Sequence, residues 1–513
     1  MSKAGTDAQG GSVGAGPRAR PVQGEGRHRG LPLLLGLVLI PLWQSTFALD
    51  PDGLDWRYRI NAATGLHDED RFVYFHYYLG LYPVATTAEH VAFSREGARR
   101  IFAEQGDTLL MEWGHTLRYG DLGRMFLCLP SAWWRGSPGH LTVRPVHAAV
   151  FIVALMALFA AFWWANQLVL GVVSVLLLGS NPFQLHAVYA EENVFGWPIS
   201  TALAVIALHL PLLCARKPAR GYVWAVPIAA GLLLATVRQI RSEPVPILLS
   251  AFFAYLVMCG EKWRVRLALV GLLAGTFAAT SYGWKAYFDF KFRQAFRAVE
   301  AAGGHPYAGP RDLHHMFWHP VWCGLGDFDT KYGYSWTDVA AARYALPILK
   351  AKYGVEVPEW DQSSHSFDAH WDKNGKYYKT PYELPHYAEV LRDKVLHDIS
   401  HDPLWYAGIL ARRVWRLLSE TTPVRLSVWK AHLTLPMHGL LVVPVLAFLA
   451  WTRRWMLLEL LCLSLPLSLT ALLIYSGDGM CWYSCYHVFA AAILLAGLIR
   501  IGASAYRRQR WAR

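Results

Sequence analysis

Charged residues are scarce in this chain. Asp, Glu, Lys and Arg make up 17% of its 513 residues, against about 25% in a typical soluble protein. Since 54% of the residues are hydrophobic, the composition excludes an ordinary water-soluble globular protein. An aromatic share of 14% also excludes a chain that is disordered over most of its length, because disordered chains are poor in apolar groups. The composition indicates a protein that resides in a membrane.

Cysteine is rare too, and the seven residues are scattered along the chain, which excludes a domain held together by a disulfide framework. In an oxidising compartment Cys481 could pair with Cys485, or Cys128 with Cys323, and the sequence does not choose between these pairings. A zinc site at Cys481 and Cys485 would have His487 as its nearest further ligand. Internal repeats and heptad runs are also missing, so solenoids and long coiled coils are excluded.

Long apolar runs, by contrast, are abundant. A helix needs about 20 apolar residues to cross a bilayer, and about ten runs approach that length. They lie at 31–48, 146–164, 168–183, 199–214, 222–236, 245–259, 265–282, 433–451, 456–475 and 488–501. The first run lacks a clear cleavage site of small residues and is interpreted as a retained anchor rather than a signal peptide. The sequence predicts an all-α polytopic integral membrane protein of about ten transmembrane helices.

The orientation follows from the basic residues, because Lys and Arg in short loops stay on the cytoplasmic side. With a cytoplasmic N-terminus, four basic clusters fall inside: Arg216, Lys217 and Arg220; Lys262, Arg264 and Arg266; Arg453 and Arg454; Arg507, Arg508, Arg510 and Arg513. The net charge of +12 is therefore mainly a topological signal, and no nucleic-acid partner is expected. We predict a protein of the bacterial inner (cytoplasmic) membrane with both termini in the cytoplasm.

This orientation divides the chain into five parts. We expect a disordered leader at 1–29, an N-terminal transmembrane module at 30–283, an outer insertion at 284–431, C-terminal transmembrane helices at 432–503 and a basic tail at 504–513. The N-terminal module includes a first outer loop at 49–145.

Four outer segments have the apolar spacing of amphipathic helices. They are 87–102, 338–353, 387–399 and 404–418. The last segment carries Arg412, Arg413 and Arg416 beside tryptophans, which favours a helix among lipid headgroups.

The first outer loop contains three consecutive carboxylates, Asp68, Glu69 and Asp70, shortly before a run of aromatic residues. A carboxylate that is partly desolvated near the bilayer is a stronger base for a substrate hydroxyl. The alternative is a solvated helix start with Asp68 as its cap.

Two further polar clusters fall on the same side. Glu191 and Glu192 lie in a connection without Lys or Arg, where they would orient an acceptor or hold a divalent cation, or else simply face water. Arg238 and Arg241 are three residues apart, so on a helical turn they would grip one phosphate with forked donors. Alternatively, these arginines reach lipid headgroups or pair with Glu243.

The order of these clusters resembles the GT-C superfamily of polytopic glycosyltransferases. The run Asp68 to Phe72 looks like the Asp-Glu-x-Arg-Tyr motif of its lipid-A aminoarabinose and protein O-mannosyl branches. Glu191 or Glu192 matches an acidic second outer loop, and Arg241 to Pro244 resembles an Arg-x-Glu element. Where the family often has Arg-Tyr in its last outer loop, this chain has Cys485, Tyr486 and His487. The resemblance implies a donor sugar on polyprenyl phosphate, a lipid, glycan or protein acceptor, and a role in the cell envelope.

On this hypothesis the reaction is an inverting sugar transfer. Asp68 is the base, Glu69, Asp70, Glu191 and Glu192 orient the acceptor or hold a cation such as Mg²⁺ or Mn²⁺, and Arg238, Arg241 and His487 bind the donor phosphate. No cofactor is certain. The alternatives are a polysaccharide ligase or polymerase, a flippase or transporter of lipid-linked sugars, and a non-catalytic scaffold.

The outer insertion carries a further alternative. His315 and His319 are four residues apart, so on a helix they would share a face and could bind a metal. Aromatic packing of a small cap with surface histidines is the competing interpretation, and aromatic rings there would also suit stacking on an acceptor sugar.

Overall fold

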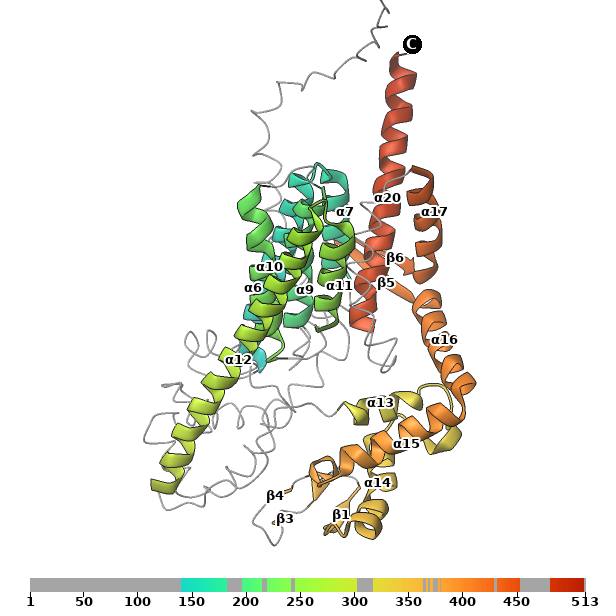
Figure 1. Ribbon diagram of the computed structural model, residues 1–513. Coiled ribbons are helices and arrows are strands. Elements are labelled where there is room, and N and C mark those ends of the chain that lie inside the picture. The colour runs from blue at the N-terminus through green and yellow to red at the C-terminus, as the bar shows by residue number, and fades with distance from the viewer. Residues whose placement is uncertain are drawn as a thin grey trace, which may run out of the picture.

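The computed structural model describes residues 140–181, 196–214, 219–240, 245–301, 317–362, 366–367, 370–371, 377–378, 380–428, 431–452 and 480–511. Of this part of the chain, 82% is helical. A helical bundle occupies one end of the molecule and a smaller helical unit the other, with α16 (Pro403–Ser419) running between them (Figure 1). Apolar sequences favour helices in a membrane because a helix satisfies its own backbone hydrogen bonds.

The bundle consists of apolar helices. They are α6 (His140–Trp164), α7 (Leu168–Gly179), α9 (Gly196–Cys214), α10 (Arg220–Val237), α11 (Val245–Phe253) with the π-helical turn η2 (Ala254–Met258), α12 (Trp263–Ala301), α17 (Val442–Thr452) and α20 (Met480–Trp511). Helix α6 packs on α7 and α9, α10 on α9 and α12, and α20 on α7 and α17. Their contact faces bury large apolar side chains such as Phe151, Phe162 and Phe489.

Three of the described helices are long and apolar enough to cross a membrane, over Arg220–Val237, Trp263–Phe290 and His487–Tyr506. Shorter apolar helices cover Ala148–Trp164, Leu168–Gly179, Ile199–Leu212, Ile247–Val257 and Gly439–Thr452. The predicted spans at 31–48 and 456–475 lie outside the described residues. The structure thus supports a mainly helical membrane protein, and the number of about ten spans stays a prediction.

Helix α12 is longer than its predicted span, which ended at residue 282. It continues to Ala301 and so passes the expected domain boundary after residue 283. Its apolar part is held against α10 at a close approach, since a Cβ atom on Gly231 would lie 2.9 Å from the Thr276 side chain. Further along, the Trp284 indole donates a hydrogen bond to the Thr236 hydroxyl at 3.2 Å.

The chain is not purely α-helical. Strands β5 (Thr421–Val428) and β6 (Ala431–His438) form an antiparallel hairpin in which Thr421 pairs with His438. The span predicted at 433–451 is therefore wrong at its beginning, because the helix starts only after β6. Residues 432–438 alternate polar and apolar side chains, which is the period of a strand rather than of a membrane helix.

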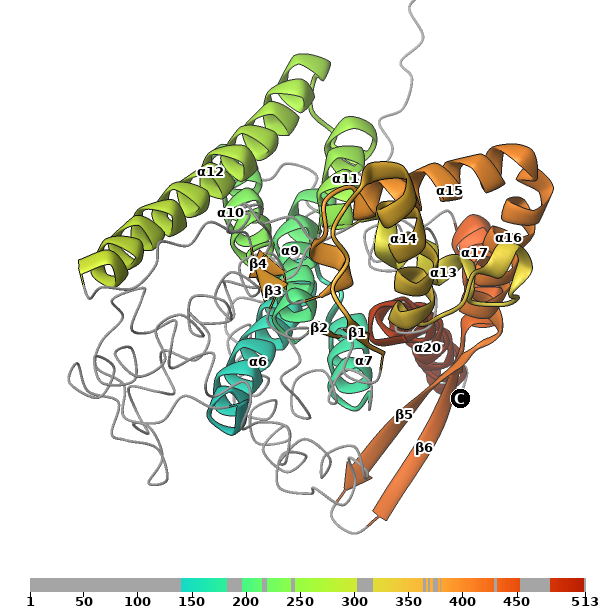
Figure 2. The ribbon, with the colours of Figure 1, turned by 90° about the horizontal axis from the view of Figure 1, so that it is seen from below.

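The unit at the other end is a small cap (residues 317–419) with its own core. It contains α13 (Trp318–Leu325), η3 (Lys331–Gly333), α14 (Asp338–Tyr353), η4 (Pro381–Glu383), α15 (Tyr387–His401) and α16, with the short strand pairs β1 (Trp360–Asp361) with β2 (Ser366–Phe367) and β3 (His370–Trp371) with β4 (Tyr377–Tyr378). Figure 2 shows α14 and α15 beside α13 on one side of the bundle axis. The cap core packs Trp322, Tyr334, Leu391 and their apolar neighbours.

The amphipathic helices predicted for this region are confirmed, at 338–353 with the same ends and at 387–399 and 404–418 with slightly longer ones. Local signals explain the ends of α14. The Thr337 hydroxyl accepts a hydrogen bond from the Ala340 amide, and Gly354 adopts the left-handed conformation at the other end, which glycine tolerates without strain.

Helix α16 belongs to both units. Ile409 is buried in the cap core, and Leu417 is buried in the bundle core. Between them, Arg413 is 1% exposed. The prediction that α16 presents all three arginines to lipid headgroups is therefore wrong for Arg413, which points into the protein. Trp415, at 61% exposed, remains on the outer face.

Candidate functional site

Most of the predicted site lies outside the described residues. This holds for Asp68, Glu69, Asp70, Glu191, Glu192 and Arg241. Their convergence on one cavity therefore stays a prediction. Arg238 and His487 are described.

Arg238 follows directly after α10 and is exposed. Its guanidinium carbon lies 5.9 Å from the centre of the Phe277 ring on α12, a distance at which an aromatic face attracts a cation. Helices α10 and α12 run in the same direction, so Arg238 lies toward the end of the bundle from which α12 extends (Figure 1). A cationic group at this position is available to an anionic ligand.

His487 has a different environment. It is fully buried near the start of α20, and its Nε2 atom lies 2.6 Å from the Leu417 carbonyl oxygen at the end of α16. A Cβ atom on Gly439 would come within 2.7 Å of the same nitrogen. Binding of a donor phosphate by His487 would require this packing to open.

The described part of the chain does not bring these two residues together. Arg238 belongs to a helix that packs on α9 and α12, whereas His487 is on α20, which packs on α7 and α17. Both views place α10 and α20 on different sides of the bundle (Figures 1 and 2).

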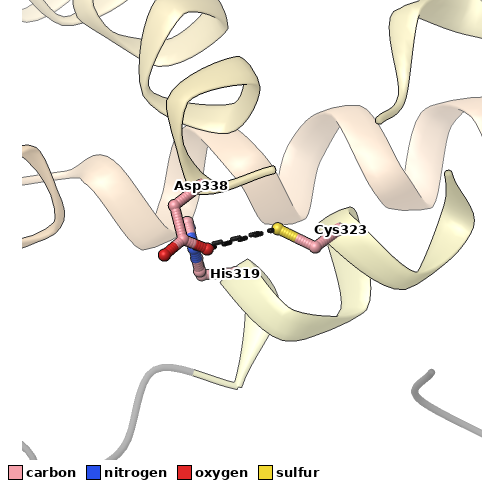
Figure 3. A group of neighbouring side chains, drawn as sticks. All are labelled: His319, Cys323 and Asp338. Carbon is pink, nitrogen blue, oxygen red and sulfur yellow. Dashed lines mark hydrogen bonds and ion pairs between the residues drawn. The ribbon is translucent and has the colours of Figure 1, made fainter. Parts of the chain in front are cut away.

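The structure instead assembles a group of three polar side chains in the cap. His319 and Cys323 are on α13, and Asp338 is the first residue of α14. Figure 3 shows the three side chains pointing toward one another. His319 Nε2 lies 3.0 Å from Asp338 Oδ1 and 3.8 Å from Cys323 Sγ, and Sγ lies 4.0 Å from the same carboxylate oxygen. These atoms all lie within 4.8 Å of one another, which is the spacing of potential metal ligands.

The group is anchored on its inner side. The second ring nitrogen of His319, Nδ1, lies 3.0 Å from the Tyr387 hydroxyl, and Tyr387 is buried in the cap core. Cys323 is a buried free cysteine. Burial, together with the neighbouring carboxylates of Asp338 and Asp327, raises the pKa of its thiol to about 12. An uncharged thiol with this environment is a poor nucleophile on its own.

Part of this group is predictable from the sequence. A metal pair of His319 with His315 and a disulfide of Cys323 with Cys128 are two alternatives that the sequence leaves open, and both His315 and Cys128 lie outside the described residues. The i, i+4 spacing of His319 and Cys323 was a readable signal for a shared helix face. Asp338 joins them only through the fold of the cap, since it begins a separate helix.

No protein-family model, no curated protein and no solved structure matches this chain.

Proposed function

We propose that this protein is a membrane glycosyltransferase that moves a sugar from a polyprenyl-phosphate donor to an acceptor on the outer, periplasmic side of a bacterial inner membrane. The observation that carries the proposal is the order of its polar motifs between apolar runs: Asp68 to Phe72, then Glu191 and Glu192, then Arg238 to Pro244. All three fall on one side of the predicted topology, and together they supply a base, an acceptor site and a phosphate site.

The chemistry is a single displacement. Asp68 accepts the proton of the acceptor hydroxyl while that oxygen forms a bond to the anomeric carbon of the donor sugar. The bond between the anomeric carbon and the phosphate oxygen breaks, and polyprenyl phosphate leaves with both electrons. Arg238 and Arg241 stabilise the negative charge that grows on the leaving phosphate. Attack from the opposite face inverts the configuration of the sugar.

Two structural features support this proposal. Arg238 is exposed at the end of a membrane-length helix, where a lipid-linked phosphate would arrive from the bilayer. The cap presents partly exposed aromatic side chains, among them Phe317 and Trp336 at 55% and 38% exposed. Aromatic faces of this kind suit a sugar or glycan acceptor.

The proposal is tested by comparing glycolipids and glycans of cells with and without the protein by mass spectrometry. A mass difference of one sugar unit identifies both the acceptor and the sugar. The purified protein is then assayed with that donor. Asp68→Asn should abolish transfer without changing the yield of folded protein, and full activity of this variant would overturn the role of Asp68.

The phosphate site needs a matched pair of variants. Arg238→Glu should weaken donor binding, whereas Arg297→Glu, an exposed arginine on the far part of α12, should not. A flippase would give a different outcome, since it would move the lipid-linked sugar across vesicles and leave its glycosidic bond intact. Equal donor affinity in both arginine variants would count against the assignment of Arg238.

A further inference from the structure

The cap places three different metal-binding side chains at one point. His319 and Cys323 are one helical turn apart on α13, so their side chains project from the same face. Asp338 opens α14, and its side chain meets that face from the side. The three residues come from two helices whose positions are fixed by a shared core that includes Trp322, Leu346 and Leu391. The group is therefore held by the fold rather than by a flexible loop.

The distances match one face of a tetrahedral metal site. Bond lengths of about 2.0 Å to oxygen and nitrogen and about 2.3 Å to sulfur require separations of about 3.3 Å between N and O and about 3.6 Å from S to either atom. The observed separations are 3.0 Å, 3.8 Å and 4.0 Å. Shifts of a few tenths of an ångström, within the range of side-chain rotation, would bring all three atoms to ligand positions.

The direction of the contacts distinguishes a metal site from a nucleophile with its base. In a Cys–His–Asp triad, the thiol and the carboxylate use opposite nitrogens of the imidazole. Here both Cys323 and Asp338 approach the same nitrogen, Nε2, and Nδ1 is taken by the Tyr387 hydroxyl. An outer partner on the second nitrogen is the arrangement that orients a metal-binding histidine. The Cys323 thiol and the Asp338 carboxylate can both carry negative charge. Together with the lone pair of His319 Nε2, they are arranged like the ligands around a cation.

The ligand set also selects the kind of cation. A thiolate with an imidazole and one carboxylate favours Zn²⁺ over Mg²⁺ or Mn²⁺, which prefer oxygen ligands. The Asp338 side chain is 56% exposed and that of His319 is 12% exposed, so the group is open to solvent on the carboxylate side. Three protein ligands with one open position are typical of zinc sites that bind water or a substrate oxygen.

We propose that His319, Cys323 and Asp338 form a Zn²⁺ site in the cap, with His319 bound through Nε2 and a fourth position open to solvent. On binding, the thiol and the imidazole nitrogen give up any protons they carry, and the metal takes the place between the three ligand atoms. The site uses none of the acidic residues that the sequence offers for Mg²⁺ or Mn²⁺, and it does not depend on the glycosyltransferase proposal.

The test uses the full chain purified in detergent, stripped with a chelator and then titrated with Zn²⁺ or Co²⁺ alone. The wild type should bind about one Zn²⁺ per chain. Bound Co²⁺ should give the intense visible bands of tetrahedral coordination and a charge-transfer band from the thiolate. Cys323→Ser should remove the charge-transfer band, and Asp338→Ala should weaken binding at least tenfold.

Two control variants separate this site from adventitious binding. His386→Asn removes an exposed histidine that pairs with Glu389 at 3.0 Å, the same kind of His–carboxylate contact without a thiol, and Cys259→Ser removes another free cysteine. Both should leave the cobalt spectrum unchanged. Because Asp338 is on the surface, its variant should fold even if a substitution of buried Cys323 does not. The proposal is overturned if metal content and spectrum are the same in wild type and Asp338→Ala, or if the controls lose as much metal as the site variants.

Discussion

The Arg413 guanidinium donates a hydrogen bond from Nε to the Asp327 carboxylate at 3.1 Å, with the two side chains only 1% and 2% exposed. A second donor, Nη2, reaches the Gly324 carbonyl oxygen at 2.6 Å. These contacts join the middle of α16 to the end of α13, the helix that carries His319 and Cys323. The ion pair thus fixes the position of the proposed metal site relative to the helix that leads into the bundle.

Loss of this pair should destabilise the cap strongly. Arg413→Ala removes the guanidinium that neutralises the buried Asp327 carboxylate, and removal of one member of a buried pair costs about 3 to 5 kcal/mol. We expect the melting temperature of the purified protein, followed by tryptophan fluorescence, to fall by several degrees. The control is the adjacent Arg412→Ala, because Arg412 is 56% exposed and contacts Asp329 at 3.4 Å, and such surface pairs contribute at most about 1 kcal/mol. Similar melting temperatures for the two variants would contradict the structural role of Arg413.

A larger side chain at Gly439 should also destabilise the protein, because this residue packs against the end of α16. A Cβ atom there would lie 2.3 Å from the Leu417 carbonyl oxygen and 2.7 Å from the Leu418 carbonyl oxygen, and backbone atoms do not yield easily. Gly439→Ala should therefore lower the melting temperature and increase protease cleavage between cap and bundle. Gly408→Ala is the matched control, since nothing lies within 4 Å of a Cβ at that position on α16. At this position the substitution should stabilise the helix by about 0.5 to 1 kcal/mol. A loss of stability in Gly408→Ala would contradict the assignment of Gly439 as the position that needs a glycine.

Lowering the pH should reduce the stability of the cap, because Asp402 at the start of α16 loses its negative charge. The Asp402 carboxylate accepts a hydrogen bond from the Lys331 ammonium at 2.6 Å and another from the Trp405 amide at 3.0 Å. These two contacts hold the pKa of Asp402 below its ordinary value. The unfolded chain, with the ordinary pKa, takes up a proton first as pH falls. The stabilisation by Asp402 is thus complete above the ordinary pKa and disappears as pH falls through the lowered one.

This effect is measured as the melting temperature between about pH 6 and about pH 3. The wild type should lose more stability over this interval than Asp402→Asn, which can still accept the Trp405 hydrogen bond but does not titrate. Glu389→Gln, on the exposed side of α15, should follow the wild-type curve. If Asp402→Asn loses as much stability as the wild type, another group governs the acid sensitivity.

The sequence predicted those features whose signals are local. The ends of α14 agree because Thr337 and Gly354 are capping residues next to an apolar helical pattern, and the apolar faces of α10 and α12 are visible in composition alone. Composition does not reveal the hairpin of β5 and β6, because its second strand adjoins an apolar helix and the two together form one apolar run of nearly membrane length. The alternation of polar and apolar residues over 432–438 is the local pattern that distinguishes the strand from the helix.

Features that depend on distant residues could not be predicted in this way. The basic and aromatic neighbours of Arg413 in the sequence predict a surface position, whereas its partner Asp327 lies 86 positions away. Of the proposed metal ligands, His319 and Cys323 share a helix face that the sequence spacing predicts. Asp338 joins them only when α13 and α14 pack on a common core. Burial and partner choice at such positions are decided by tertiary structure, about which helical spacing contains no information.

The orientation of the chain provides the last prediction. The cap and the C-terminal end of α20 lie at opposite ends of the bundle (Figure 1), so a membrane crossed by the bundle would separate them. Because basic residues stay in the cytoplasm, we expect the arginine-rich end of α20 to be inside and the cap outside.

Ala351→Cys on α14 and Ala505→Cys on α20 place a thiol at an exposed alanine in each region. In intact spheroplasts a membrane-impermeant maleimide should label the first variant above the wild-type background and the second only after permeabilisation. Labelling of Ala505→Cys in intact spheroplasts would reverse the topology and place Arg238 on the cytoplasmic side, where a donor on the outer leaflet would not reach it.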